Sequence, residues 1–176
     1  MTCILLVDDE ASVLKALVRT MRQHLPIKDL HIETFVDPFE ALSRCAEVRF
    51  DIVISDFRMP SMNGIEFLHA MKQAAPDTVR MILSASTEFD TVRLAISEAQ
   101  VFRYISKPWQ VGELSESIRM ALLHRARQVE HVRWDEALRV QAGLLTPQQA
   151  EARQRERDAL DLTNFAWEPK DDTCSG

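Results

Sequence analysis

The chain has 176 residues, which is long enough for one α/β domain with an appendage but too short for two large domains. Its formal net charge of −6 excludes polyanion binding through bulk charge, so any contact with nucleic acid would need a local basic patch. The three cysteines have neither metal-ligand nor redox spacing, and no apolar run has signal-peptide or membrane-span length, which predicts a cytoplasmic protein with free thiols and no membrane contact.

Short apolar runs of strand length alternate with amphipathic helical stretches over most of the chain. Asp37-Pro38 offers an N-cap followed by proline at the first helical position, and Pro26 and Pro76 end the helices before them. The repeated strand–helix unit predicts an α/β fold with a parallel, doubly wound sheet. The predicted strands span residues 3–7, 31–35, 51–55, 79–83 and 101–105, and the helices that follow them span residues 11–24, 39–48, 65–75 and 87–98, with a fifth from 111 onward.

The helix that begins near Val111 does not end where the fifth helix of such a domain should end. Helix-compatible sequence continues to Gly143, which makes roughly 30 residues, or about 45 Å at the rise of an α-helix. The sequence Thr-Pro-Gln-Gln at 146–149 has capping-box spacing and predicts a second, polar helix to about Leu160. We expect the final stretch, residues 162–176, to be either a short docking strand or a frayed tail anchored only by Phe165 and Trp167.

Polar residues of particular types follow or end the predicted strands. Because the carboxyl ends of parallel strands meet at one edge of a sheet, we expect these side chains to converge in a crevice. Three carboxylates together favour a bound cation such as Mg²⁺, and a carboxylate beside the metal can act as a nucleophile toward a phosphoryl donor. An ammonium and a hydroxyl would then contact the phosphoryl oxygens. The residues are Asp8, Asp9, Asp56, Ser84, Tyr104 and Lys107.

Each of these residues alone also has an ordinary structural interpretation. Asp8 or Asp9 could cap the first helix, Lys107 could be a solvated lysine, and Tyr104 could be a half-buried strand residue. Their joint occurrence at strand ends favours a phosphoryl-transfer site.

The segments ILLVDDE, VISDFRMP, MILSAS and YISKPW, in this order and spacing, resemble the receiver domain of bacterial two-component response regulators. The resemblance covers residues 1–122 and implies a flavodoxin-like, five-stranded parallel sheet with strand order 2-1-3-4-5. Residues 123–176 would then form a C-terminal helical extension with a short tail. The family takes phosphoryl groups from a histidine kinase, a phosphotransfer protein or small donors, and the receiver itself catalyses its phosphorylation and dephosphorylation.

The resemblance also implies a role for each strand-end residue. Mg²⁺ would be held by Asp8, Asp9, Asp56 and the backbone carbonyl of Arg58. Asp56 would be the phosphoacceptor, Lys107 the phosphate-contacting lysine, Ser84 the switch hydroxyl and Tyr104 the aromatic switch residue, with a cis peptide bond between Lys107 and Pro108. On phosphorylation, we expect Ser84 to move toward the phosphate and Tyr104 to rotate, which would remodel the face from which the long helix leaves.

The C-terminal segment contains no helix-turn-helix, cyclase, phosphodiesterase or ATPase motif, so no enzymatic output domain is predicted. We predict instead a helix that dimerises or docks a partner, with a homodimer through residues 111–142. Its apolar seam would consist of Leu122, Val129 and Val132, with Trp134 and Leu138 as anchors.

Other interpretations of this segment stay open. It could be a solvated helix with charge pairs, or the chain could be a phosphate sink. The phrase FRYISKPW also resembles receivers that precede cyclic-di-GMP phosphodiesterase or ATPase modules, so the chain could be an adaptor descended from such a regulator. A nucleic-acid-binding regulator is less favoured, because acidic residues interrupt the only basic cluster, which consists of Arg119, His124, Arg125, Arg127, Arg133 and Arg139.

Overall fold

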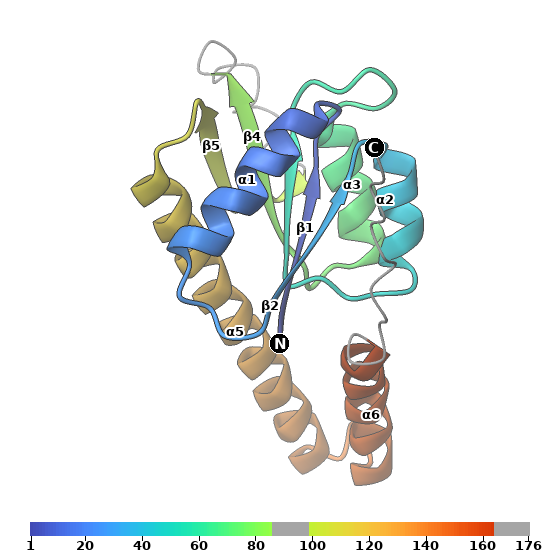
Figure 1. Cartoon of the computed structure of the whole chain (residues 1–176). Coiled ribbons are helices and arrows are strands. Elements are labelled where there is room, and N and C mark those ends of the chain that lie inside the picture. The colour runs from blue at the N-terminus through green and yellow to red at the C-terminus, as the bar shows by residue number, and fades with distance from the viewer. Residues whose placement is uncertain (86–98, 164–176) are drawn as a thin grey trace.

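The chain folds into a parallel sheet covered by helices on both faces, followed by a helical extension (Figure 1). The computed structural model describes residues 1–85 and 99–163, with side chains as far as Arg157. The predicted helix over residues 87–98 and the tail with Phe165 and Trp167 lie outside the described residues. The elements are β1 (Thr2–Val7), α1 (Ala11–His24), β2 (Leu30–Phe35), α2 (Pro38–Cys45), β3 (Ile52–Asp56), α3 (Gly64–Ala74), β4 (Val79–Ala85), β5 (Arg103–Lys107), α5 (Val111–Gln141) and α6 (Pro147–Thr163).

The five strands are parallel and lie in the order β2-β1-β3-β4-β5, which confirms the predicted flavodoxin-like topology. At the carboxyl edge of the sheet, Val7 pairs with Ser55, and Asp56 pairs with Leu83. The last pair of β4 and β5 is Ala85 with Lys107. This register places the ends of β1, β3, β4 and β5 side by side.

Alternate residues of the central strand β1 enter two different cores. Leu5 and Val7 pack on the side of α2 and α3, whereas Ile4 and Leu6 pack on the side of α1 and α5. Figure 1 shows these two helix pairs on opposite faces of the sheet. Because both faces are covered, β1 is buried from Cys3 to Val7 and consists of a continuous apolar run rather than an alternating one.

The structure shifts several predicted boundaries. The second helix ends at Cys45 instead of residue 48, and the fourth strand continues to Ala85, which places Ser84 within it. The fifth strand is Arg103–Lys107 rather than 101–105. Pairing with β4 decides this last shift, because Met81 aligns with Arg103, and that register is invisible in the local sequence.

The predicted long helix is confirmed: α5 has 31 residues and ends just before Gly143, which adopts a φ of 71° that favours glycine. The predicted capping box at the start of α6 is also confirmed. The Thr146 amide donates to the Gln149 side chain at 2.9 Å, and the Gln149 amide donates to the Thr146 hydroxyl at 3.2 Å. Helix α6 turns back beside α5, so the extension is a helical hairpin (Figure 1).

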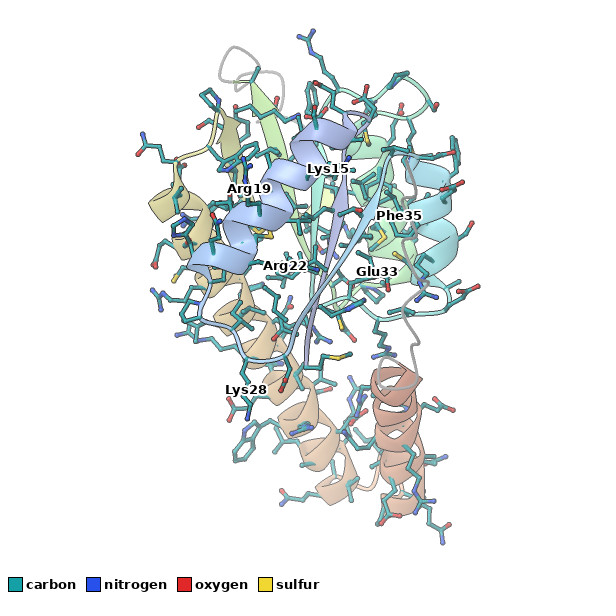
Figure 2. All side chains as sticks on the ribbon, in the orientation of Figure 1. Lys15, Arg19, Arg22, Lys28, Glu33 and Phe35 are labelled. Carbon is teal, nitrogen blue, oxygen red and sulfur yellow. The ribbon has the colours of Figure 1, made fainter. Side chains whose placement is uncertain are left out.

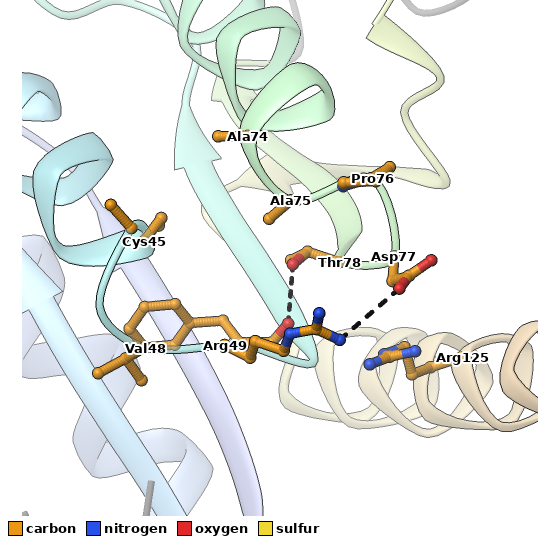
Figure 3. A pocket seen from close by; sticks show the side chains of 11 residues that line it. Cys45, Val48, Arg49, Ala74, Ala75, Pro76, Asp77, Thr78 and Arg125 are labelled. Atoms are coloured by element: carbon orange, nitrogen blue, oxygen red, sulfur yellow. Dashed lines mark hydrogen bonds and ion pairs between the residues drawn. The ribbon is translucent and has the colours of Figure 1, made fainter. Parts of the chain in front are cut away.

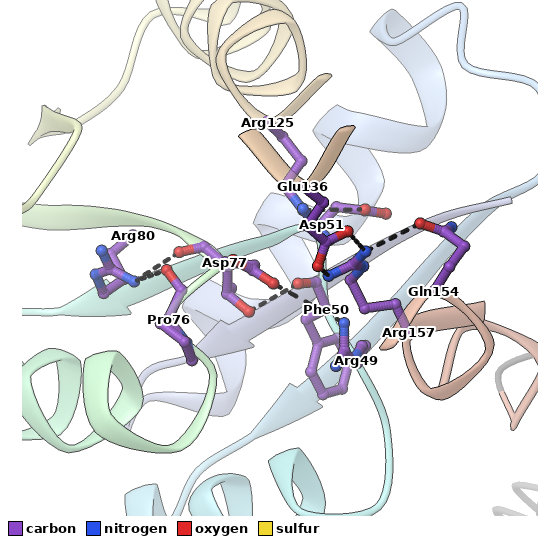
Figure 4. Close-up of polar contacts among 11 residues, drawn as sticks. Arg49, Phe50, Asp51, Pro76, Asp77, Arg80, Arg125, Glu136, Gln154 and Arg157 are labelled. Carbon is purple, nitrogen blue, oxygen red and sulfur yellow. Dashed lines mark hydrogen bonds and ion pairs between the residues drawn. The ribbon is translucent and has the colours of Figure 1, made fainter. Parts of the chain in front are cut away.

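Ion pairs hold the hairpin together and connect it to the amino edge of the sheet (Figure 4). The Arg157 guanidinium of α6 binds both carboxylate oxygens of Glu136 on α5 and also donates to Gln154 at 3.1 Å. Nearer the sheet, Arg125 of α5 lies 3.8 Å from Asp51. The hairpin is thus fixed at the edge opposite the predicted reaction site. No helix in the described part of the chain is long and apolar enough to cross a membrane.

Candidate functional site

Three charged residues from distant parts of the chain meet at the carboxyl edge of the sheet. Asp8 follows β1, Asp56 ends β3 and Lys107 ends β5. The Lys107 ammonium lies 2.7 Å from Asp8 Oδ2 and 2.5 Å from Asp56 Oδ1, so one cation bridges two carboxylates. Both carboxylates are buried, with exposed fractions of 1% for Asp8 and 6% for Asp56.

At both Asp56 and Lys107, burial shifts the pKa in one direction and the oppositely charged neighbours shift it in the other. Burial raises the pKa of Asp56, as does the nearby Asp8 charge, while Lys107 and the Arg58 amide lower it; the net effect is a raised pKa. Burial lowers the pKa of Lys107, but its hydrogen bonds to Asp56 and Asp8 outweigh this and leave the pKa raised. Lys107 is therefore positively charged at neutral pH. The charged form of Asp56 is only partly stabilised by its surroundings.

The backbone around Asp56 is held in place by the loop that follows it. The Arg58 amide donates to Asp56 Oδ2 at 2.6 Å, and the Phe57 amide donates to the Leu83 carbonyl at 2.9 Å. Gly64 approaches this segment so closely that an added Cβ would lie 2.0 Å from the Asp56 carbonyl oxygen. Gly64 is not among the residues predicted from the sequence, although the Asn63-Gly64 pair is a loop signal that could have singled it out.

Ser84 and Tyr104 lie on the neighbouring strands β4 and β5. Ser84 is buried, and the Tyr104 hydroxyl donates to the backbone carbonyls of Ser84 at 3.1 Å and Ala85 at 2.9 Å. Burial raises the pKa of Tyr104, so the phenol remains a proton donor at neutral pH. The peptide bond between Lys107 and Pro108 is cis.

The predicted metal ligands are brought together only in part. Asp8 and Asp56 share Lys107, whereas the side chain of Asp9 is exposed and Arg58 lies beside Asp56 in the following loop. Within residues 1–85 and 99–157, no three His, Cys, Asp or Glu side chains converge as a metal site. These residues still suit a divalent cation. Two buried carboxylates and one ammonium leave the site with net negative charge, and carboxylate oxygens are ligands that Mg²⁺ prefers.

A cavity of about 200 Å³ lies at the opposite, amino edge of the sheet (Figure 3). It lies between the loops before β3 and β4, and Arg125 of α5 borders it. Arg49 and Asp77 in its wall lie 3.9 Å apart, and burial raises the pKa of the Cys45 thiol to about 12. An unreactive thiol and a weak ion pair offer no reaction chemistry, so this cavity is not the candidate site.

An open groove of about 840 Å³ runs between α1 and the edge strand β2. Lys15, Arg19 and Arg22 line it from α1, and Figure 2 shows these side chains on that helix. Their spacing along the helix places the three cations on one face. The groove is thus a basic surface on the helix that begins beside Asp8.

The structure separates the residues predicted to form the seam of the extension. Leu122 packs on the receiver core, and Val129 and Val132 line a small pocket beside α6 together with Arg157. Val132 is itself 37% exposed. Trp134 and Leu138 are also exposed. In the basic cluster, Arg119, Arg125 and Arg139 pair with Glu116, Asp51 and Asp135, so these arginines do not form an unpaired basic stripe.

Comparison with known proteins identifies the family of this chain. The family model described as the response regulator receiver domain matches residues 4–119, and the chain belongs to this family. The crystal structure of the signal receiver domain of an HD domain-containing protein from Pseudomonas fluorescens Pf-5 is similar, with a TM-score of 0.65 and 31% identity. The match covers 72% of this chain and 98% of that one.

Two curated relatives extend the comparison. The hydrogenase transcriptional regulatory protein HoxA of Cupriavidus necator is 29% identical over 142 residues, covering 81% of this chain and 28% of the relative. The cyclic di-GMP phosphodiesterase response regulator RpfG of Xanthomonas campestris is 33% identical over 173 residues, covering 96% of this chain and 43% of the relative. The chain thus spans less than half the length of these relatives, and the match to RpfG continues through the hairpin.

The chain is therefore a receiver of the two-component response regulators, as the sequence motifs predicted. Receivers of this family generally bind Mg²⁺ for phosphorylation and interact with histidine kinases or phosphotransfer proteins. No output domain is recognised beyond the receiver.

Proposed function

We propose that this chain is a phosphorylation-controlled switch in which Asp56 accepts a phosphoryl group and the helical hairpin passes the signal on by protein–protein contact. The observation that carries the proposal is the Lys107 ammonium bridging Asp8 and Asp56 at the carboxyl edge of the sheet. This arrangement provides a nucleophile, a cation for phosphoryl oxygens and a second carboxylate within one buried site.

In the proposed transfer, an Asp56 oxygen forms a bond to phosphorus while the bond from phosphorus to the donor histidine nitrogen breaks. The Arg58 amide holds one Asp56 oxygen and Lys107 holds the other, so the carboxylate is fixed before the donor arrives. After the transfer, the Lys107 ammonium contacts the phosphoryl oxygens and neutralises part of their negative charge. Asp8, Asp9, Asp56 and the Arg58 carbonyl would hold Mg²⁺, which when bound would further neutralise the phosphoryl oxygens.

The donor is a phosphohistidine on a histidine kinase or a phosphotransfer protein, and such a protein must approach the carboxyl edge. Helix α1 begins at this edge directly after Asp8. The basic groove of Lys15, Arg19 and Arg22 beside it supports contact with an acidic surface of the donor.

The switch proposed for the phosphorylated state starts from the contacts of Tyr104. Its hydroxyl is bound to the carbonyls of Ser84 and Ala85 at the end of β4. If the Ser84 hydroxyl moves toward a phosphoryl group on Asp56, the end of β4 shifts and these two hydrogen bonds change. Tyr104 then rotates, and the face of β5 and α5 is remodelled.

The output proposed for this change is the extension over residues 123–176, treated as a unit separate from the receiver over residues 1–122. Helix α5 is continuous from the receiver core into the hairpin, so a shift of its first turns moves the whole extension. The similarity to RpfG, which continues beyond the receiver, supports the extension as part of the signalling element. The alternatives are an adaptor descended from a multidomain regulator, whose tail acts on another protein in trans, and a phosphate sink without any output.

The test is labelling with radioactive acetyl phosphate in the presence of Mg²⁺, followed by analytical ultracentrifugation with and without beryllium fluoride. We expect acid-stable, base-labile labelling at Asp56 and a change in mass on activation. Labelling at another residue would contradict the assignment of Asp56. Labelling without any change in mass would leave the phosphate sink or a different partner.

A further inference from the structure

The cavity of about 200 Å³ at the amino edge of the sheet, which we call the amino-edge cavity, is lined mostly by apolar side chains (Figure 3). Val48 and Phe50 form part of its wall and are buried, and the exposed Ala74 borders it. Sites for drug-sized ligands typically have volumes of about 300–1,000 Å³. The amino-edge cavity is smaller, so its size and its apolar wall suit a single large side chain.

A second, smaller cavity lies beside the first on the side of α6, and together they form a basic region. Four arginines line the two cavities, against the single lining carboxylate of Asp77. Arg157 is already bound to Glu136. Arg125 lies 3.8 Å from Asp51, and its buried Nε atom has no hydrogen-bond partner among the described residues. An acidic group at this place would therefore complete the hydrogen bonding of Arg125.

Helix α6 leads the chain back to this region. It runs from the tip of the hairpin toward the receiver (Figure 1), and its Gln154 and Arg157 line the second cavity together with Arg49 and Asp77 of the receiver (Figure 4). The helix ends at Thr163, which is six residues, or about 9 Å, beyond Arg157. The chain thus leaves α6 within reach of the amino-edge cavity.

The sequence that follows α6 contains both kinds of group that suit the two cavities. Residues 164–176 include two aromatic side chains, Phe165 and Trp167. Trp167 is four residues beyond Thr163, which spans at most about 14 Å when the chain is extended. The segment has a net charge of −2, from Glu168, Lys170, Asp171 and Asp172. An aromatic residue followed directly by an acidic one matches an apolar cavity bordered by arginines.

We propose that residues 164–176 fold back onto the receiver of the same chain, with Trp167 in the amino-edge cavity and Glu168 beside Arg125. The indole buries its apolar surface against Val48 and Phe50, and the carboxylate accepts a hydrogen bond from the guanidinium. The short connection to α6 gives the segment a high effective concentration at its own receiver, which favours it over the same segment of a second copy.

This docking would fix the hairpin to the receiver at a further place besides the ion pair of Arg125 with Asp51. It concerns the edge of the sheet opposite Asp56 and requires no phosphoryl group. The inference therefore goes beyond the proposed function, and phosphorylation of Asp56 provides an independent readout of correct folding.

Disulfide cross-linking of the full chain tests the placement. In a Cys174→Ser background, in which the remaining cysteines are buried, Ala166→Cys is combined with Ala74→Cys beside the cavity. The control combines Ala166→Cys with Ala11→Cys, at an exposed alanine near the carboxyl edge. We expect a disulfide within one chain to form about tenfold or more faster in the first pair. Equal rates in the two pairs, no disulfide, or disulfides that join two chains would each overturn the inference.

A second comparison tests the role of the aromatic side chain. Trp167→Ala, added to the first pair, should slow the disulfide about tenfold or more, because the group that fills the cavity is lost. Trp134→Ala removes a tryptophan of 66% exposure from α5 and should leave the rate unchanged. Asp56 labelling should be normal in both variants. Equal rates in the two variants would contradict the inference, whereas absent Asp56 labelling with the disulfide intact would contradict only the proposed function.

Discussion

The polar groups at the two edges of the same parallel sheet differ in how completely they are paired. At the carboxyl edge, two buried carboxylates, Asp8 and Asp56, share the single ammonium of Lys107. At the amino edge, the buried Arg80 donates to three backbone carbonyls, and the Thr78 hydroxyl donates to the Phe50 carbonyl at 2.8 Å. One edge keeps an excess of negative charge, and the other places polar groups against matched partners.

This difference is consistent with the proposed function of each edge. A site proposed to receive a phosphoryl group and a divalent cation cannot satisfy all its charges beforehand, since the incoming groups supply the missing partners. An edge that anchors loops and a helical hairpin gains stability only if its buried groups are already paired. Mutations at the carboxyl edge should therefore change chemistry, and mutations at the amino edge should change stability.

The largest expected effect is the loss of labelling in Asp56→Asn. The amide cannot attack phosphorus, so labelling by acetyl phosphate with Mg²⁺ should fall to background. The matched control is Asp51→Asn at the amino edge, where Asp51 accepts a hydrogen bond from the Cys3 amide at 2.9 Å. The control should label normally, and normal labelling of Asp56→Asn would overturn the assignment.

Replacing the half-buried Lys107 at one edge and the buried Arg80 at the other should separate effects on the labelling rate from effects on stability. Lys107→Met should slow the labelling of Asp56 on the order of a hundredfold, because the phosphoryl oxygens lose their cation. Arg80→Met leaves buried carbonyls without donors and should lower the free energy of unfolding by about 3 kcal/mol. Both variants are measured in two ways: the rate of Asp56 labelling at urea concentrations at which the chain is still folded, and the free energy of unfolding from the urea curves. A slowed reaction in folded Arg80→Met would erase the distinction.

Two of the glycines, Gly64 and Gly112, offer a smaller, paired test. Gly64→Ala places a Cβ into the Asp56 carbonyl and should cost about 1–3 kcal/mol of stability while slowing labelling. Gly112→Ala, within α5, meets no atom within 4 Å and should be neutral or stabilise by up to about 1 kcal/mol. Urea unfolding and labelling are measured on both. Equal effects would show that the close approach at Asp56 is unimportant.

The raised pKa of Asp56 predicts a modest pH dependence. A carboxyl whose pKa is higher in the folded state binds its proton more tightly there, so it contributes stability below about pH 4 that is lost as pH rises through the folded pKa. Asp56→Asn lacks this loss, so its stability relative to the unmodified chain should increase with pH across this window. Urea unfolding between pH 3.5 and 7.5 measures the difference, and a constant or decreasing difference would contradict it.

The smallest effect concerns the amino-edge cavity. With its pKa raised to about 12, the Cys45 thiol should remain protonated and unreactive at pH 8. In the Cys174→Ser background, iodoacetamide should label the native chain only after urea is added. Rapid labelling of Cys45 in the folded chain would show that the amino edge opens readily.

Much of this fold was predictable because its signals are local. The apolar run from Cys3 to Val7, the Asp37-Pro38 cap and the stop at Gly143 all appear in short segments, and the structure confirms the elements they predict. The fifth strand was misplaced by two residues, because pairing with β4 across the sheet sets its limits. The close approach of Gly64 to Asp56 was missed for a related reason, since it depends on where the loop returns.

The fold class and the proposed reactive groups could be read from the sequence, because apolar periodicity and strand-end residue types are properties of adjacent positions. How the charges are shared depends on the tertiary structure: Lys107 bridges Asp8 and Asp56, while Asp9 faces solvent. The tertiary structure also decided which face of α5 meets α6, since Glu136 is buried against Arg157 while Trp134 is exposed. Such outcomes depend on contacts between segments far apart in the chain, which no local pattern encodes.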